Sequence, residues 1–448
     1  MKLNKELEVK IQKFRRDRRA YVSFIILSMM FLLTLPAEFL CNVRPILLVV
    51  DGKIHFPILL TYSERDFGGT LPSEPDYNSR HFHRLLYGEE KSAALNNESS
   101  DASLSLDDFE DSPGMGLGLD DFEETSPSLD LGMADFEDGP ATQEKPDFSL
   151  GLGDFEDTGN PLQSASIETS PAQPTPPKEV WALWPPIRYD YKYIPSESQT
   201  GKVVLAAPYE TMSANGEEVI ESAWKDGHYL GTDDRGRDIL ARLIYGLRIS
   251  MIFGLSLAVT GTIIGCFLGG FQGFFGGWVD LVGQRLTEIW GSIPRLYILI
   301  ILSAFLVPSA ILLFLILNLT AWMGIAAYIR AEFLKIRNFE FVKAAKAMGV
   351  SDFQIMRRHI LPNAITPVVT FFPFEVTAGI LALVSLDYLN LGVPSPAPSI
   401  GELLSQGKNN LQAIWIILPT FAVLTATITL LTFVGEGIRN AFDPRRNA

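Results

Sequence analysis

Six runs of apolar residues, each about as long as a helix that crosses a lipid bilayer, constrain the fold of this 448-residue chain more than any other feature. A helix needs about 20 apolar residues to span the hydrocarbon. The predicted crossings are Tyr21–Cys41, Met251–Phe275, Ile289–Val307, Ala310–Ile329, Pro367–Leu389 and Ile414–Val434, with a tight turn near Pro308 between the third and the fourth. The sequence therefore predicts an all-α polytopic membrane protein with six transmembrane helices.

Lys and Arg in the short segments between crossings predict the orientation in the membrane. If both termini are in the cytoplasm, the basic residues gather on the cytoplasmic side, at Lys13–Arg19, Arg285, Arg330–Arg358, Arg439, Arg445 and Arg446. The short segment on the opposite side, Asn390–Ala413, carries only Lys408. We therefore expect a cytoplasmic N-terminus at 1–20, a first crossing at 21–41, a periplasmic region at 42–250 and a membrane core at 251–448. The first crossing is too long for a signal peptide and lacks a small-x-small cleavage site, so it is predicted to remain as an anchor.

The periplasmic region contains an acidic insert at 88–177. Between Glu98 and Glu168 there are 20 acidic residues and one basic residue, Lys145, so the formal charge of −15 belongs to the insert and does not indicate a basic partner for the whole protein. No nucleic acid is expected among its partners. The tetrad D-F-E-[DE] recurs there at irregular spacing, starting at Asp108, Asp121, Asp135 and Asp154. Few branched apolar residues are present to offset chain entropy, which predicts disorder. The repeats are interpreted either as docking motifs for a basic groove or, preferably, as a tolerated surface insertion.

The sequence offers no sign of catalysis. Only two cysteines occur, Cys41 and Cys266, for which no disulfide is expected. His81 and His83 form the best metal candidate, but a plain polar loop is favoured there and no metal site is predicted. The phosphate-binding loop, H-E-x-x-H and G-x-S-x-G motifs are missing from the sequence. We therefore expect neither enzyme activity nor a cofactor.

Glycines recur at every fourth position of the second crossing. They are predicted to form a stripe without side chains on which another helix packs closely, and they are Gly261, Gly265, Gly269, Gly273 and Gly277. Polar groups within the crossings are few. Glu375 and Asn318 are candidates for a translocation path, and for Glu375 a structural pairing near the interface is the favoured alternative.

The stretch from His228 to Ser250, with GTDDRGRD at 231–238, is predicted to turn at its glycines and to start an interfacial helix that leads into the second crossing. Asp238 is the predicted helix cap. The charged residues are interpreted as turn and capping elements rather than as ligands.

The predicted cytoplasmic loop 334–366 contains two short helical pieces. Alanines favour a helix from Glu340 to Ile355, with a break at Gly349, and a second piece from Phe353 to Leu361 is predicted to end at Pro362. Such a pair of helices, held by crossings on both sides, would be a rigid peg.

This loop resembles a family. The pattern A-A-x-x-x-G followed by L-P is similar to the ATPase-coupling loop of the permease subunits of ATP-binding-cassette importers. Three further motifs resemble the peptide, dipeptide and nickel branch of this family: R-H-x-L-P-N, GTDDRGRD and R-x-x-Y-G-x-R-x-S. A closer resemblance, to the Yej-type peptide permeases of that branch, comes from YSERDFGGTL, GELLSQGKNNLQA and AFDP. The Yej-type permeases are also associated with microcin C.

The coupling residues that the resemblance implies are Lys343, Ala344, Ala345, Gly349, Arg358, His359, Leu361, Pro362 and Asn363. Lys343 stands where the family has an acidic residue, and residues 88–177 have no counterpart in the family pattern.

The resemblance implies a permease subunit that moves peptides across the bacterial inner membrane. Its expected partners are a companion permease in a heterodimer, a cytoplasmic ATPase, a periplasmic substrate-binding protein, the peptide and membrane lipid. Two alternatives come from other classes: an ion-coupled secondary transporter, which usually has paired midplane charges and inverted repeats that this sequence lacks, and a membrane scaffold that recruits partners through its acidic repeats.

Overall fold

The computed structural model describes residues 2–87, 179–195, 202–212, 219–305 and 309–442. The described residues all belong to one compact unit. The predicted disordered insert at 88–177, the turn near Pro308 and the basic residues Arg445 and Arg446 lie outside the described residues.

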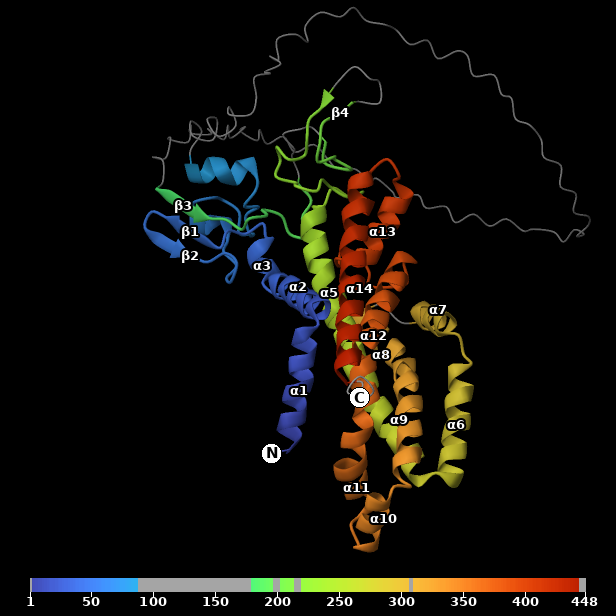
Figure 1. Cartoon of the computed structure of the whole chain (residues 1–448). Helices are drawn as coiled ribbons and strands as arrows, with labels where there is room; N and C mark the ends of the chain where they lie inside the picture. Colours follow the sequence, from blue (N-terminus) through green and yellow to red (C-terminus); the bar gives the residue numbers. More distant parts are fainter. Residues whose placement is uncertain (1, 88–178, 196–201, 213–218, 306–308, 443–448) are drawn as a thin grey trace, which may run out of the picture. The chain divides into compact units, whose positions relative to one another are not determined.

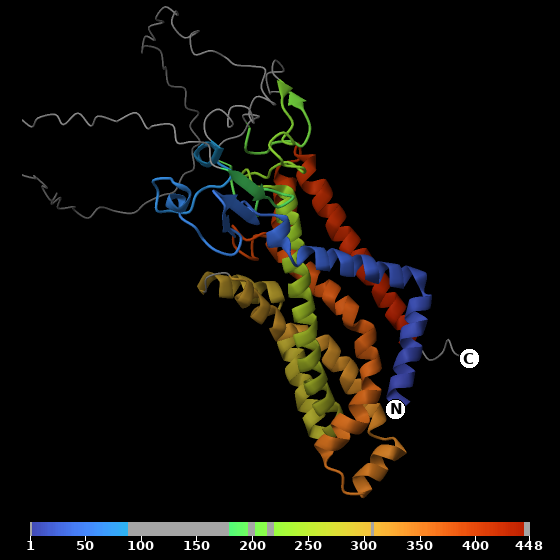
Figure 2. The same cartoon turned by 90° about the vertical axis from the view of Figure 1, so that its left-hand side faces the viewer.

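The N-terminal segment forms three helices rather than one long crossing. These are α1 (Lys2–Arg16), α2 (Arg18–Thr34) and α3 (Ala37–Leu40). Asp17 separates the first two and caps α2, since its carboxylate accepts a hydrogen bond from the Ala20 backbone N–H. The predicted first crossing thus consists of α2, of 17 residues, followed by a break at Pro36 and the short α3. Figure 2 shows α2 lying across α14 (Ile414–Phe442), against which it packs.

Two small antiparallel sheets occupy the region predicted to be outside the membrane. The first has the order β2-β1-β3, from Lys53–His55, Leu47–Val50 and Val180–Leu183, and the second pairs β4 (Thr211–Met212) with β5 (Val219–Ile220). The 3₁₀ helix η1 (Glu64–Phe67) packs beside the first sheet, where Leu48, Phe67 and Phe82 are buried together. The prediction of an all-α protein was therefore wrong for this region. The run LLVV of β1 is short, contains two β-branched valines and is alternately buried, which favours a strand.

The second predicted crossing and the helix before it are one continuous helix, α5 (Ile239–Phe275). Asp238 caps it as predicted, accepting a hydrogen bond from the Ala241 N–H at 2.7 Å. The helix ends where Gly276 adopts a positive φ of 63°. The third predicted crossing, in contrast, is not one helix: α6 (Gly277–Gly291) and α7 (Arg295–Phe305) are interrupted before Pro294, because a proline disfavours helical backbone at the residue that precedes it.

The remaining elements form the C-terminal half of the chain. They are α8 (Ala310–Ala321), α9 (Met323–Ile336), α10 (Glu340–Ala347), α11 (Asp352–Ile355), the π-helical turn η3 (Met356–Ile360), α12 (Leu361–Tyr388), α13 (Ile400–Asn409) and α14. Among the described residues, four helical stretches are long and apolar enough to cross a membrane: Ile239–Phe275, Ala310–Ile336, Asp352–Tyr388 and Ile414–Phe442. The protein is therefore mostly helical, with four candidate spans.

The second helical piece of the predicted loop does not end at Pro362. The chain stays helical from Asp352 to Tyr388 because η3 has wider π-helical turns immediately before the proline. In η3 the Leu361 N–H donates to the Met356 carbonyl, five residues back. Pro362 itself occupies the start of α12, where its missing N–H does little harm.

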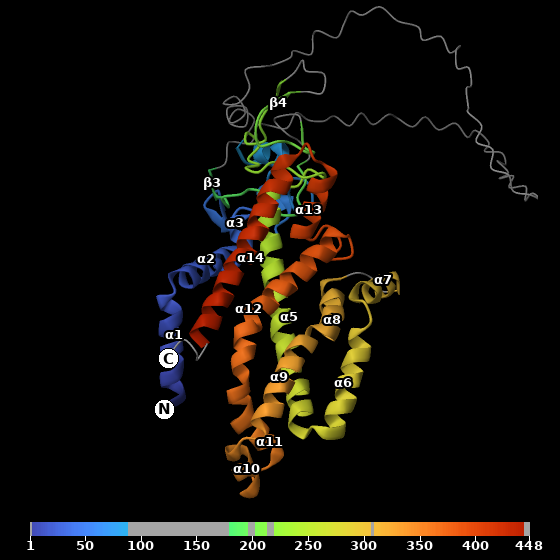
Figure 3. The same ribbon diagram turned by 45° about the vertical axis from the view of Figure 1, so that its right-hand side comes forward.

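Helix α5 is central to the packing of this unit. It lies against α9 and α12, and α12 also packs against α13 and α14 (Figure 1). Figure 3 shows α10 and α11 at one end of these helices and α13 at the opposite end. The candidate sites lie at these two ends and along α5.

Candidate functional site

The first candidate site is the elbow, defined as residues 340–363. Its bend is a helix-terminating motif: the Gly349 N–H donates to the Lys346 carbonyl at 3.1 Å, and the Val350 N–H donates to the Ala345 carbonyl at 3.2 Å. This pair of bonds is the Schellman arrangement, which requires a left-handed residue. Gly349 has a φ of +78°, so a residue with a side chain would be strained there.

The elbow is fixed to the spanning helices by an apolar core. Val342 and Ala345 of α10 and Ile355 of α11 are buried in one cluster with residues of α9 and α12. The members from these longer helices are Ile325, Ile329, Phe333, Ile336, Ala364 and Val368, with Ile360 of η3 between them. A force on the elbow would therefore be transmitted to both spanning helices.

The tip of the elbow exposes apolar side chains. Met348 is 76% exposed and Phe353 is 68% exposed. Burying such side chains against a partner removes apolar surface from water, so an exposed pair at the end of a rigid projection is typical of a docking surface.

The predicted coupling residues divide between the surface and the core of the elbow. Ala345 is buried, and His359 and Leu361 are partly buried. The exposed members are Lys343, Ala344, Gly349, Arg358, Pro362 and Asn363. Asn363 donates to the His359 carbonyl at 2.7 Å and thus stabilises the turn that leads into α12.

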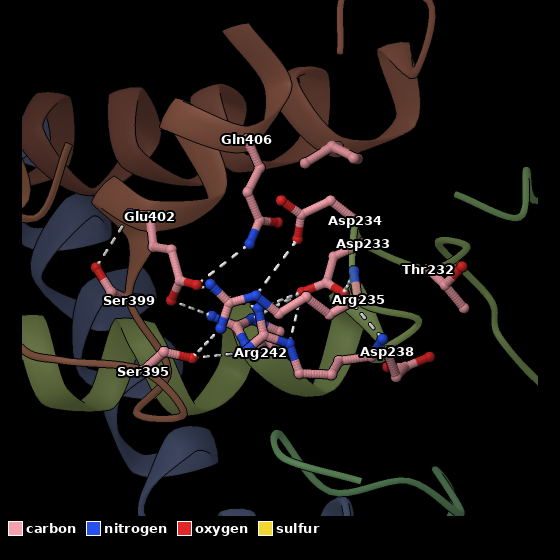
Figure 4. A network of polar contacts seen from close by, with 12 residues as sticks. Thr232, Asp233, Asp234, Arg235, Asp238, Arg242, Ser395, Ser399, Glu402 and Gln406 are labelled. Carbon is pink, nitrogen blue, oxygen red and sulfur yellow. Dashed lines mark hydrogen bonds and ion pairs between the residues drawn. The ribbon is translucent and has the colours of Figure 1, made fainter. Parts of the chain in front are cut away.

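The second candidate site is a group of four charged residues, here called the polar clamp: Asp233, Arg237, Arg242 and Glu402. The first three are buried, and the Glu402 side chain is 14% exposed. Figure 4 labels Asp233, Arg242 and Glu402 of this group. Arg237 Nη2 lies 2.7 Å from Asp233 Oδ2 and 3.1 Å from Glu402 Oε1. Arg242 Nη2 lies 2.6 Å from Glu402 Oε2. Two positive and two negative charges balance, which is what makes their burial tolerable.

The polar clamp joins parts of the chain that lie far apart in the sequence. Three members belong to the GTDDRGRD turn and the first turn of α5, whereas Glu402 belongs to α13. Nearby, Ser399 caps α13 and donates to Asp387 of α12 at 2.5 Å. The clamp thus fixes one end of α5 to α13, and the Ser399–Asp387 bond fixes the start of α13 to α12.

Sequence reasoning missed this site. The GTDDRGRD segment is predicted to provide turns and caps, which Asp238 and Gly236 do, but Asp233, Arg237 and Arg242 are fully buried ionic partners. The sequence does contain one indication of a buried ionic group, because Arg242 stands on the face of α5 where apolar residues recur. Glu402 carries no signal, because its partners lie 160 and 165 residues away.

The predicted glycine stripe faces the helical stretch of α8 and α9 over four of its five positions. A Cβ on Gly265 would lie 2.7 Å from the Trp322 carbonyl oxygen, and one on Gly273 would lie 2.6 Å from the Arg330 carbonyl oxygen. Gly261 and Gly269 meet the backbones of Ala321 and Ala326 in the same way. Gly277 does not belong to this face: it lies beyond the end of α5, has a φ of +56°, and a Cβ at this position would meet no described atom within 4 Å.

The two polar residues predicted for a translocation path line different cavities. Glu375 of α12 lines a cavity of about 200 Å³ between α5, α8, α9 and α12. Asn318 of α8 lines one of about 770 Å³ that is bordered by α5 and α6, and it accepts a hydrogen bond from Thr260 at 2.6 Å. Because α12 is continuous with α11, Glu375 lies well inside the span rather than near its predicted start.

The histidine pair does not converge on a common ligand. His81 Nε2 lies 3.1 Å from Glu64 Oε1, whereas the ring of His83 stacks on those of Tyr87 and Trp184. Burial lowers the pKa of His83. Within the described residues no group of three or more His, Cys, Asp or Glu side chains is arranged for a metal ion.

Known proteins resemble this chain along nearly its whole length. Residues 244–448 match the family model of the binding-protein-dependent transport system inner membrane component. The peptidoglycan transport system permease protein YejE of Agrobacterium fabrum is 36% identical over 441 residues, covering 97% of this chain and 92% of that protein. The inner membrane ABC transporter permease protein YejE of Escherichia coli is 33% identical, covering 97% and 96%. The oligopeptide transport system permease protein OppC of Escherichia coli is 36% identical over 222 residues, 49% of this chain and 74% of that protein.

Proposed function

Because this chain belongs to the family of ABC-importer permeases that includes the YejE proteins, we propose that it forms one half of the membrane path of a peptide importer. It is a multi-pass protein of the inner membrane, and its family consists of transport permeases rather than enzymes. Peptide is the cargo named for the relative OppC, and modified peptides remain within the same class.

The observation that supports this proposal most is the construction of the elbow. Its interior is packed against α9 and α12, and its tip presents Met348 and Phe353 to solvent. A rigid projection with an apolar tip suits an element on which another protein pushes. We assign that role to a separate cytoplasmic ATPase, since the sequence contains no phosphate-binding loop of its own.

In this mechanism ATP binding brings two ATPase subunits together and moves the elbow. The motion passes through the apolar core to α9 and α12, which then change their packing against the glycine face of α5. Close contact without interlocking side chains allows such a shift between two packings. A companion permease encloses the path, and a periplasmic binding protein delivers the peptide.

The proposed topology has six crossings with both termini in the cytoplasm. Four crossings are the long helical stretches, and α2 with α3 and α6 with α7 provide the first and third in broken form. The elbow then lies on the cytoplasmic side, whereas the sheets and the polar clamp lie outside, where the binding protein would dock.

Replacement of Gly349 by Val tests the role of the elbow. A β-branched residue cannot easily adopt a φ of +78°, so the bend must rearrange. We expect a variant that inserts in the membrane and binds its partners but no longer couples ATP hydrolysis to peptide uptake in the reconstituted importer.

The matched control is Gly52→Val. Gly52 has a φ of +74° in the turn between β1 and β2, and a Cβ there also meets nothing within 4 Å among the described residues. It carries the same backbone strain at a site remote from the elbow and should leave coupling intact. Normal uptake in Gly349→Val, or equal losses in both variants, would contradict the proposed role of the elbow.

A further inference from the structure

The cavity beside Glu375 has the composition of a binding site inside the membrane. Its polar lining residues come from three helices: Glu375 on α12, Thr262 on α5 and Thr320 on α8. Ionisable groups in membrane spans are costly and normally face protein or a water-filled path. A glutamate beside a cavity inside a span therefore points to a polar occupant.

The helical stretch opposite Glu375 is irregular at the level of the cavity. Within the span Ala310–Ile336, α8 ends at Ala321 and α9 starts at Met323, and Trp322 between them keeps helical backbone angles. Ala321 and Gly324 both line the cavity, so this span forms one of its walls.

Small residues keep the cavity open. Gly261, Gly324 and Gly379 line it from the three sides. A Cβ on Gly324 would lie 3.7 Å from Glu375 Oε1, in contact with the carboxylate. The space of about 200 Å³ admits a charged end group with a few attached atoms and water, but not a whole peptide.

We propose that this cavity binds the ammonium group of the translocated peptide, with Glu375 as its counterion. An ammonium group has three N–H donors, no acceptor and a positive charge, which suits a cavity whose ionisable lining residue is a glutamate. The ammonium is that of the amino terminus or of a lysine side chain, which share this chemistry. The inference rests on the proposed function and deepens it, since it makes Glu375 a determinant of which peptides pass.

The test compares three peptides in the complete importer, purified with its partner subunits and reconstituted in vesicles. The probes are trialanine, N-acetyl-trialanine and N-acetyl-Ala-Lys-Ala, and the readout is the kcat/KM of ATP-driven uptake for each. In Glu375→Gln, which keeps the shape of the side chain and removes its charge, we expect uptake of the peptides with an ammonium group to fall about tenfold, with little change for N-acetyl-trialanine. A loss for trialanine alone assigns the site to the amino terminus, and a loss for both cationic peptides assigns it to any ammonium.

Glu436→Gln is the matched control, because Glu436 is an exposed carboxylate on the spanning helix α14 and does not line the cavity. It should change no ratio between the peptides. A Glu375→Gln variant that transports all three peptides as the wild type does, or loses all three equally while its ATPase activity is retained, overturns the inference alone. Failure of the wild-type importer to take up any of the peptides overturns the proposed function and the inference with it.

Discussion

The elbow and the polar clamp lie at opposite ends of the same helices, and opposite kinds of interaction hold them. In the elbow, Ile355 and its neighbours bury apolar side chains against α9 and α12, and charged groups remain at the surface. In the clamp, the buried groups are the charges themselves, with Arg242 fully buried between Glu402 and Asp233. Both ends are tightly packed, but different kinds of substitution are expected to destabilise them.

The two ends also differ in how they fail. An apolar core loses stability in proportion to the volume removed, so it tolerates small changes. A buried ionic group depends on the presence of every partner, because a charge left alone in the interior keeps the full cost of its lost hydration. We infer that the elbow can be strained without coming apart, which suits a lever, whereas the clamp acts as a fixed anchor.

Removing one member of the clamp is expected to have the largest effect. Arg242→Ala leaves Glu402 without its 2.6 Å partner and lowers the free energy of unfolding by about 3–5 kcal/mol. The measurement is the unfolding transition of the purified protein in mild detergent. Lys225→Ala is the control, since it breaks an exposed pair with Glu221 and should cost less than about 1 kcal/mol.

A double variant sharpens the same comparison. Arg242→Met with Glu402→Leu removes both charges and leaves the Arg237 and Asp233 pair, at 2.7 Å, intact. Replacing both members of a buried pair by apolar residues is often nearly neutral, so the double variant should be more stable than Arg242→Ala alone. A double variant as unstable as the sum of the single variants would show that charge burial is not what distinguishes the clamp.

Substitutions in the core of the elbow are expected to lower the free energy of unfolding by a smaller amount, which depends on the volume removed. Ile355→Val removes one methylene from a fully buried side chain and should lower the free energy of unfolding by about 1 kcal/mol, without loss of coupling between ATP hydrolysis and uptake.

Met348→Ser changes a side chain that is 76% exposed, so it should leave the unfolding transition unchanged and weaken retention of the ATPase during purification. If Met348→Ser retains the ATPase as well as the wild type does, the tip is not the docking surface.

The same two regions separate what the sequence could predict from what it could not. The elbow depends on neighbours in sequence: alanines, Gly349 and Asp352 lie within a few residues of one another, so their local preferences predict the bend. Pro362 was misjudged because the π-helical turn that accommodates it depends on packing rather than on a local signal. Four of the long apolar runs correspond to long helical stretches, including α14, which continues through Pro419, whereas the run around Pro294 is divided between α6 and α7.

The clamp and the Glu375 cavity needed the structure. Glu402 is an ordinary acidic residue of an amphipathic helix until its partners are known, and these come from about 160 residues earlier. Glu375 was recognised as unusual, but the cavity beside it was not, because its lining residues come from four helices that only the three-dimensional arrangement brings together.

The smallest predicted effect comes from a partly exposed charge beside the clamp. Burial and the neighbouring Asp233 carboxylate raise the pKa of Asp234. The folded state therefore binds a proton more readily than the unfolded state, and wild-type stability decreases as the pH rises through the folded pKa. In Asp234→Asn no carboxylate has to be held in this unfavourable environment, so the variant should be slightly more stable than the wild type at pH 7. The side chain is 36% exposed, so solvent screening limits the gain to less than about 1 kcal/mol.

That gain should shrink as the pH falls through the raised pKa toward the value of an unfolded aspartate, since the wild-type carboxyl is then protonated in the folded state as well. Unfolding transitions of the two proteins, measured in parallel over this range, check the sign. A gain that grows on acidification would mean that Asp234 is stabilised as a carboxylate, and Arg235, 4.0 Å away, would then be counted as part of the clamp.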